Sequence, residues 1–195
     1  MRKKMRTIYL ILFCLTFSGC TGPEKKSEVH DHETMVENKE NGKTKSPKRM
    51  AMTNVGRNHV HIEYSAPQKR GRQIFGGLVA FGEVWVTGAH RATTIQFSQD
   101  VIIENTKIAA GKYALFTIPG EEEWTIIINK NWDQHLADDY DPNEDLVRVR
   151  TVPTILEQPL ESLTYDVEAL DETTGKIIIS WDDISVDFKI KNTES

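Results

Sequence analysis

The sequence predicts an all-β domain, a single antiparallel β-sandwich of jelly-roll-like type with about ten strands. Apolar and polar residues alternate with a period of two in stretch after stretch between residues 46 and 195. Glycines and prolines typical of turns separate these stretches at short intervals. The best helical candidate, WDQHLADDY (132–140), is no longer than about two turns, so we expect no layer of helices.

Each predicted strand follows from its own pattern. Alternating segments have one face for the core and one for solvent, and in chain order they are HVHIEYS (59–65), TTIQFS (93–98), LTYDVEAL (163–170) and ISVDFKI (184–190). Two segments are apolar on both faces, as expected of central strands: GKYALFTIPG (111–120) and EWTIIIN (123–129). A further strand, KIIISW (176–181), is expected to end in a two-residue turn at Asp182-Asp183.

The first 19 residues predict a secretory signal peptide. The segment MRKKMR (1–6) is basic, and the apolar run IYLILFCLTF (8–17) that follows it is too short to cross a hydrocarbon core of ~30 Å. The segment ends in FSGC, which resembles a bacterial lipobox, in which Cys20 is lipidated and becomes the first residue of the mature chain. Cys14 leaves with the signal peptide. Lipid attachment therefore explains the one remaining cysteine, and the alternative is a free thiol.

Residues 20–45 predict a flexible tether between the lipid and the domain, because they are highly charged and hold few aromatic or branched apolar residues. The β-sandwich domain then spans residues 46–195. We expect an exported protein, lipid-anchored to the bacterial envelope at the outer membrane and facing the periplasm. Its first partner is the membrane, through the lipid on Cys20.

The charge of the domain excludes one class of partner. Residues 46–195 hold 15 Lys and Arg against 23 Asp and Glu, which gives a net charge of −8. Nucleic-acid-binding domains carry a basic patch or stripe, and this sequence shows none. We therefore expect no nucleic-acid partner.

Six stretches of the domain form a specific pattern when taken together: SPKRMAM (46–52), YSAP (64–67), GRQIFGGLVAFGEVW (71–85), TGAHRATTIQFSQDV (87–101), AAGKYALFTIPG (109–120) and EWTIIIN (123–129). On these residues the chain resembles domain-of-unknown-function family 2911. The resemblance implies an exported or lipid-anchored β-sandwich protein of Gram-negative bacteria, and it implies no particular activity. Many members have Arg in place of Val86 and Asn in place of His90, so no shared mechanism is implied either.

Four histidines of the domain are candidate metal ligands: His59, His61, His90 and His135. His59 and His61 are two apart on a predicted strand, so both rings leave the same face with Cβ atoms about 7 Å apart. That spacing suits two ligands of one Zn or Fe ion, with His90 as a third ligand from a neighbouring loop. The other interpretation is that both rings lie on the solvent side of a half-buried strand.

The stretch GEVWVTGAHRATT (82–94) contains four candidate binding residues: Trp85, Thr87, His90 and Arg91. If the domain is a β-sandwich, this stretch forms two strands and the loop that connects them, and Trp85 belongs mainly to the core. His90 and Arg91 are then the residues of this stretch best placed to bind a ligand, because they lie at the end of the sandwich where loops gather and sites are usually built.

Trp132 is the fifth candidate binding residue, because it lies in the polar stretch NKNWDQH (129–135). An indole ring with amide and carboxylate neighbours is suited to stacking on a sugar or another flat ligand. The alternative is that Trp132 caps one end of the sandwich core.

The leading hypothesis is a lipid-anchored envelope protein that binds a small molecule, a glycan or an envelope protein and does not catalyse a reaction. It rests on the lipobox, the tether, the all-β domain and the lack of a recognisable catalytic motif, and it requires no cofactor. One alternative is a metal-dependent enzyme that binds Zn or Fe through His59, His61 and His90. A second alternative is an envelope scaffold, which a flat surface with no cavity beside Trp132 or His90 would favour.

Overall fold

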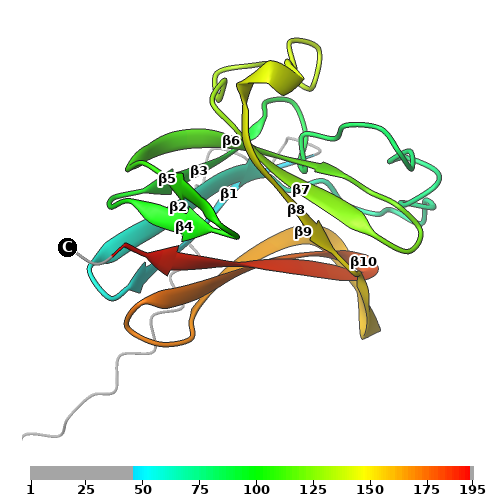
Figure 1. Ribbon diagram of the computed structural model, residues 1–195. Helices are drawn as coiled ribbons and strands as arrows, with labels where there is room; N and C mark the ends of the chain where they lie inside the picture. Colours follow the sequence, from blue (N-terminus) through cyan, green and yellow to red (C-terminus); the bar gives the residue numbers. More distant parts are fainter. Residues whose placement is uncertain (1–45, 194–195) are drawn as a thin grey trace, which may run out of the picture. The chain divides into compact units, whose positions relative to one another are not determined.

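The computed structural model describes residues 46–193, so the predicted signal peptide, Cys20 and the tether lie outside the described residues. The described residues form two antiparallel β-sheets, of six and four strands, that pack face to face (Figure 1). The predicted β-sandwich is confirmed. Within residues 46–193 there are ten strands and no α-helix, only a 3-10 turn at Pro142–Glu144. This part of the chain contains no helix long and apolar enough to cross a membrane.

Both sheets follow a simple strand order. The larger sheet contains, from edge to edge, β1 (Lys48–Val55), β2 (Asn58–Ser65), β3 (Thr93–Phe97), β6 (Gly111–Ile118), β7 (Trp124–Asn129) and β8 (Asp145–Thr151). The smaller sheet contains β5 (Thr106–Ile108), β4 (Val101–Ile103), β10 (Thr174–Asn192) and β9 (Thr154–Ala169). The larger sheet is a meander interrupted only by the β4–β5 hairpin. The likeness to a jelly roll therefore lies in the two packed sheets and not in the strand order.

The core lies between the sheets and is built by the alternation read from the sequence. On β2, Val60 and Ile62 are fully buried between the sheets, whereas His59 and Glu63 are exposed on the outer face. Trp181 of β10 is the largest fully buried side chain that the smaller sheet contributes. Burial of each large apolar side chain of this kind contributes about 1.5–3 kcal/mol to folding.

A second, smaller apolar cluster lies on the outer face of the larger sheet. Ala114 and Phe116 of β6 and Ile127 of β7 are buried there under Val86 and Ala92, which belong to the connection between β2 and β3. This cover explains why β6 and β7 are apolar on both faces: one face packs on the sandwich core and the other packs under a loop.

One predicted turn is a bulge. Asp182 and Asp183 do not end a strand, because β10 continues through them and pairs with β9 on both sides. The register shifts between Ser180 and Asp182 and again between Asp182 and Ile184. Asp182 has a φ of 53°, and its carboxylate accepts a hydrogen bond from Lys69. Left-handed Asp is tolerated at irregular positions, so the same residues that suit a turn also suit a bulge.

A buried hydrogen-bond network holds the chain at Thr87. Thr87 is fully buried and has a φ of 49°, an unfavourable backbone conformation for a β-branched residue. Its carbonyl oxygen accepts hydrogen bonds from the Tyr165 hydroxyl at 2.8 Å and the Thr93 hydroxyl at 2.9 Å. Its own hydroxyl bonds to Trp85 O and Thr117 Oγ1. The network spans both sheets and fixes where the β2–β3 connection turns.

The network at Thr87 makes a stability prediction. Tyr165→Phe should lower the free energy of unfolding by about 1–2 kcal/mol, because it removes a hydrogen bond between fully buried groups. The control is Tyr113→Phe, whose hydroxyl donates to Ala109 O at the surface and should cost less than about 0.5 kcal/mol. Urea denaturation of the three proteins measures both values. Equal losses in the two variants would show that the buried network does not support the fold.

Candidate ligand-binding pocket

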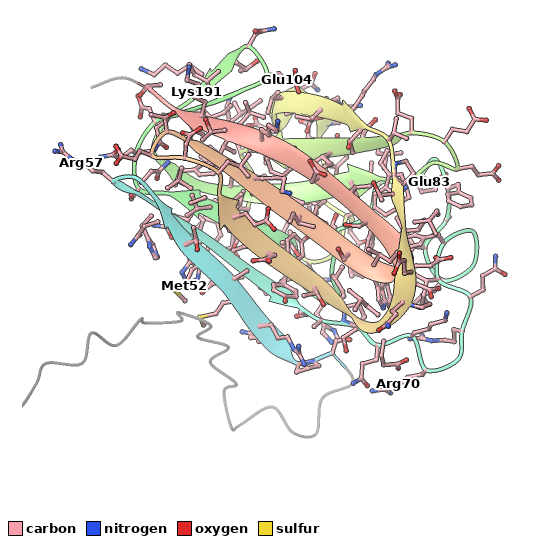
Figure 2. All side chains as sticks on the ribbon, turned by 90° about the horizontal axis from the view of Figure 1, so that it is seen from below. Met52, Arg57, Arg70, Glu83, Glu104 and Lys191 are labelled. Atoms are coloured by element: carbon pink, nitrogen blue, oxygen red, sulfur yellow. The ribbon has the colours of Figure 1, made fainter. Side chains whose placement is uncertain are left out.

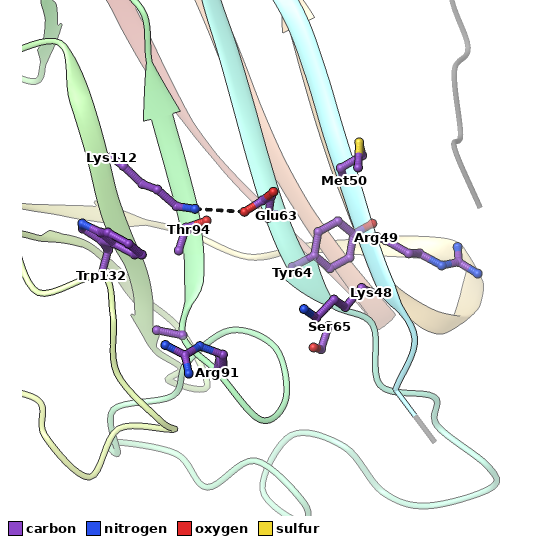
Figure 3. Close-up of a pocket in the computed structure, with 11 residues that line it drawn as sticks. Lys48, Arg49, Met50, Glu63, Tyr64, Ser65, Arg91, Thr94, Lys112 and Trp132 are labelled. Atoms are coloured by element: carbon purple, nitrogen blue, oxygen red, sulfur yellow. Dashed lines mark hydrogen bonds and ion pairs between the residues drawn. The ribbon is translucent and has the colours of Figure 1, made fainter. Parts of the chain in front are cut away.

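A pocket of about 350 Å³ opens on the outer face of the larger sheet, beside the second apolar cluster (Figure 3). Strands β1, β2, β3 and β6 of the sheet provide one set of lining residues: Lys48, Arg49, Met50, Glu63, Tyr64, Ser65, Thr94 and Lys112. The connecting loops provide the other set: Arg91, Ala92 and Trp132. The pocket therefore has a floor of strands and a wall of loops.

Strand register brings the floor residues together. Lys48 lies opposite Ser65 across β1 and β2, and Glu63 lies opposite Thr94 across β2 and β3. Paired residues in an antiparallel sheet point to the same face, so these four side chains share the outer face. Lys112 extends the floor from β6 and donates a hydrogen bond to Glu63 Oε2 at 2.9 Å.

Two loops bond to each other to form the wall. The amide of Ala92, next to β3, donates to Gln134 O at 3.1 Å. The amide of Leu136 donates to His90 O at 2.8 Å, and the Arg91 guanidinium forms an ion pair with Asp133. His90 and Leu136 both have a positive φ, 69° and 51°. Backbone strain of this kind persists only where the surroundings fix the chain, and here the paired loops fix it.

The base of the second loop is anchored to the sheet. Asn129 is fully buried, and its side-chain amide donates to Asp141 O at 3.0 Å and to Asp145 Oδ1 at 2.8 Å. Tyr140 packs edge-on against Phe116 and donates its phenol proton to Asp145 at 2.7 Å. Burial, with the hydrogen bond to Asp145, raises the pKa of Tyr140 to about 12, so the phenol stays protonated at neutral pH. Asn129 therefore supports the loop and does not line the pocket.

Trp132 stands at the top of this wall with 41% of its surface exposed. The Lys112 ammonium lies 4.8 Å from the centroid of its ring, a cation–π contact, and bonds to Glu63 on its other side. Mainly through the hydrogen bond from Lys112, the pKa of Glu63 is lowered, so this carboxylate is ionised at neutral pH. The chain of contacts from Glu63 through Lys112 holds the indole beside the floor.

The pocket is basic although the domain is acidic. Its lining contains Lys48, Arg91 and Lys112 against the single carboxylate of Glu63, whereas the guanidinium of the fourth basic residue, Arg49, points away from the pocket in Figure 3. Lys112 is paired within the pocket, and Arg91 is paired with a carboxylate outside the lining. Among residues 46–193, the Lys48 ammonium makes no side-chain hydrogen bond or ion pair and acts on Glu63 only as a nearby positive charge. In Figure 3 it points from β1 toward the Trp132 side. The arrangement presents positive charge to whatever enters.

Of the five candidate binding residues, Arg91 and Trp132 line this pocket. Thr87 is fully buried in the network described above. Trp85 stacks on Trp181 with ring centroids 5.8 Å apart and donates its Nε1 proton to Gly88 O, so it is mainly a core residue, as expected. His90 is exposed on the loop beside the pocket and does not line it.

The candidate metal ligands fall into two places. His59 and His61 lie together on β2, with ring centroids 6.1 Å apart. His90 and His135 lie on the two paired loops, where Arg91 and His135 form a β-bridge. Residues 46–193 contain no group of three or more His, Cys, Asp or Glu side chains placed to hold a metal ion. The geometry therefore gives the Zn or Fe enzyme with His59, His61 and His90 no third ligand.

Most of the floor was not identified from the sequence. Lys48, Ser65, Thr94 and Lys112 come from four different strands, and only the pairing of those strands makes them neighbours. The sequence could have predicted that Glu63 lies on the outer face, because the alternation of HVHIEYS places it there.

Comparison with known proteins gives a family and no activity. The family model described as "Protein of unknown function (DUF2911)" matches residues 46–190. No curated protein matches the chain, and no solved structure matches it.

Proposed function

The chain belongs to the DUF2911 family of proteins of unknown function, and from its pocket we propose that it binds a small anionic ligand whose ring stacks on an indole. The ligand class that fits best is an acidic monosaccharide or an aromatic carboxylate. Three features support this proposal: an exposed indole, an excess of basic side chains and a volume suited to a small molecule.

The observation that carries the proposal is the placement of Trp132. Its ring is 41% exposed, yet the loop that bears it is bonded to a second loop and anchored on the sheet. A large aromatic ring held out of the core in this way offers a surface on which a sugar or aromatic ring stacks. The pocket beneath it has about 350 Å³, within the ~300–1,000 Å³ range of small-molecule sites.

The charge of the lining selects the ligand. Lys48 is free to bond an incoming carboxylate, sulfate or phosphate, and Arg91 reaches the pocket from the loop wall. Ser65 and Thr94 add hydroxyl groups on the floor, which suit ligand hydroxyls. Glu63, held by Lys112, provides one fixed acceptor that a ligand hydroxyl can approach. Anionic polyhydroxylated rings satisfy all of these groups together.

We extend the proposal to the location predicted from the sequence. A lipid on Cys20 places the protein on the bacterial envelope, and 26 residues (20–45) separate that lipid from the domain. The ligand is then one found in or passing through the periplasm. The proposal includes a glycan or an envelope protein as the partner if it presents an acidic ring to Trp132. A scaffold function alone would not explain why the protein has this pocket.

If the pocket binds such a ligand, replacing Trp132 should weaken the binding. Trp132→Ala should weaken binding of the best ligand at least about tenfold, equivalent to about 1.4 kcal/mol. The measurement is a thermal-shift screen of uronic acids, sialic acid and aromatic carboxylates, followed by calorimetric titration of the strongest binder. Lys48→Met should weaken the same ligand and leave neutral monosaccharides unaffected.

The matched control is Phe81→Ala. Phe81 is an aromatic residue with 38% of its surface exposed, comparable to Trp132, but it does not line the pocket, so its truncation should leave affinity unchanged. Two results would contradict the proposal: no compound in the screen binds, or the bound compound retains full affinity for the Trp132→Ala protein.

The location makes a separate prediction. Cys20→Ser should move the protein from the membrane fraction to the soluble periplasmic fraction, because it removes the only proposed site of lipid attachment. Immunoblots of fractionated cells measure this, with Cys14→Ser as the control that keeps membrane association. Unchanged membrane retention of the Cys20→Ser protein would refute the lipid anchor.

A further inference from the structure

Two methionines and two histidines share the outer face of β1 and β2, next to the ligand pocket. Met52 lies directly opposite His61 in the strand register, and Met50 lies opposite Glu63. His59 is two residues from His61 on β2, so it leaves the same face. Figure 2 shows Met52 projecting outward from β1, away from the sandwich. Two thioethers and two imidazoles are thus gathered on one surface of adjacent strands.

His59 is oriented by a partner on the neighbouring strand. Its Nδ1 lies 2.8 Å from Asn54 Oδ1, which is a hydrogen-bond acceptor. This hydrogen bond forms when the ring proton is on Nδ1, which is the tautomer that leaves the Nε2 lone pair free for a metal ion. Metal-binding histidines are usually held in this way, with the non-ligating nitrogen bonded to an oxygen that fixes the tautomer and the ring orientation.

His61 has an unsatisfied ring nitrogen. Its Nε2 is buried and makes no hydrogen bond within residues 46–193. The nearest acid is Glu63, with Oε1 at 3.6 Å, beyond hydrogen-bonding distance, and the other Glu63 oxygen is bonded to Lys112. A buried polar atom without a partner is costly, by about 1–3 kcal/mol, unless an ion or ligand occupies it.

The spacing of the two rings fits one shared ion. A metal bound about 2 Å from each of two ring nitrogens, with a wide angle between the bonds, holds the ring centroids about 6 Å apart. The centroids of His59 and His61 lie 6.1 Å apart. Met52 pairs with His61 across the two strands, so its thioether leaves the same face and is the candidate third ligand, with Met50 two residues before it.

We propose that His59, His61 and Met52 form a binding site for Cu(I). Thioether sulfur is a soft ligand that favours Cu(I), and imidazole suits copper as well, whereas Zn and Fe sites seldom use thioethers. This site differs from a three-histidine site, because its third ligand is a sulfur and His90 takes no part. The proposal does not rest on the ligand of the Trp132 pocket, although Met50 and Glu63 lie beside both sites.

The test uses Ag(I), an air-stable substitute for Cu(I), and the full chain. Both cysteines are replaced by serine in every sample, because free thiols bind Ag(I) themselves. NMR of protein labelled at the methionine methyl groups follows the metal directly. On addition of one equivalent of Ag(I), the methyl resonance of Met52 should shift, and that of Met35 should stay unchanged.

Variants assign the ligands. Met52→Leu, which nearly conserves volume, and His61→Gln should each weaken Ag(I) binding at least about tenfold in a competition titration. His135→Gln and the paired change His30→Gln/His32→Gln are controls that should leave the affinity unchanged. Thermal unfolding of each variant confirms that it is folded before its affinity is compared.

Four results would contradict the site. The Met52 methyl resonance does not respond to Ag(I), or Met52→Leu and His61→Gln bind as tightly as the parent protein. Alternatively, the affinity is lost in the His30→Gln/His32→Gln protein, which would assign the metal to the segment before the domain. Tighter binding of Zn(II) than of Ag(I) to the same histidines would also contradict a thioether ligand.

Discussion

The candidate site depends on the pairing of two loops above the larger sheet. The β2–β3 connection and the β7–β8 connection bond to each other through Ala92 and Gln134 and through His90 and Leu136. The buried hydrogen-bond network at Thr87 holds the β2–β3 connection on the sheet. Hydrogen bonds of Asn129 and Tyr140 hold the β7–β8 connection. Without this pairing, Trp132 would be an unsupported surface residue. With it, an indole stands beside the sheet and a flat outer face becomes a pocket.

The pocket also separates charge within an acidic domain. The domain carries a net charge of −8, yet the side chains of Lys48, Arg91 and Lys112 reach the pocket against the one carboxylate of Glu63. Basic groups gathered in this way repel one another, and ion pairs reduce the repulsion at Arg91, through Asp133, and at Lys112, through Glu63. The Lys48 ammonium forms no ion pair among residues 46–193 and can bind a ligand. The surrounding negative field disfavours large polyanions, whereas a small anion meets mainly the local positive charge.

The sequence predicted the fold better than the site. Period-two alternation depends on local pattern, so it located β2, β3 and the second half of β9 and placed Glu63 on the outer face. The strand expected just before Gly88 was wrong, because that stretch lies in the β2–β3 connection and pairs only through a bridge at Trp85. Trp132, which the sequence left as either a stacking surface or a cap of the core, is exposed. Lys48 and Lys112 could not be found in this way, because they meet Glu63 only through long-range strand pairing. Thr87 was a candidate binding residue but is buried in a structural network, and Asp182-Asp183 suited a bulge as well as a turn.

The central claim is that the wall bearing Trp132 is already formed in the free protein. Amide hydrogen exchange of the full chain without ligand tests it most directly, at Ala92 and Leu136, whose amides join the two loops. Both amides should exchange at least about a hundredfold more slowly than unprotected amides, as expected of groups that open only with a larger structural unit. Exchange of both at the rate of an unprotected loop would contradict a preformed wall and, with it, the pocket.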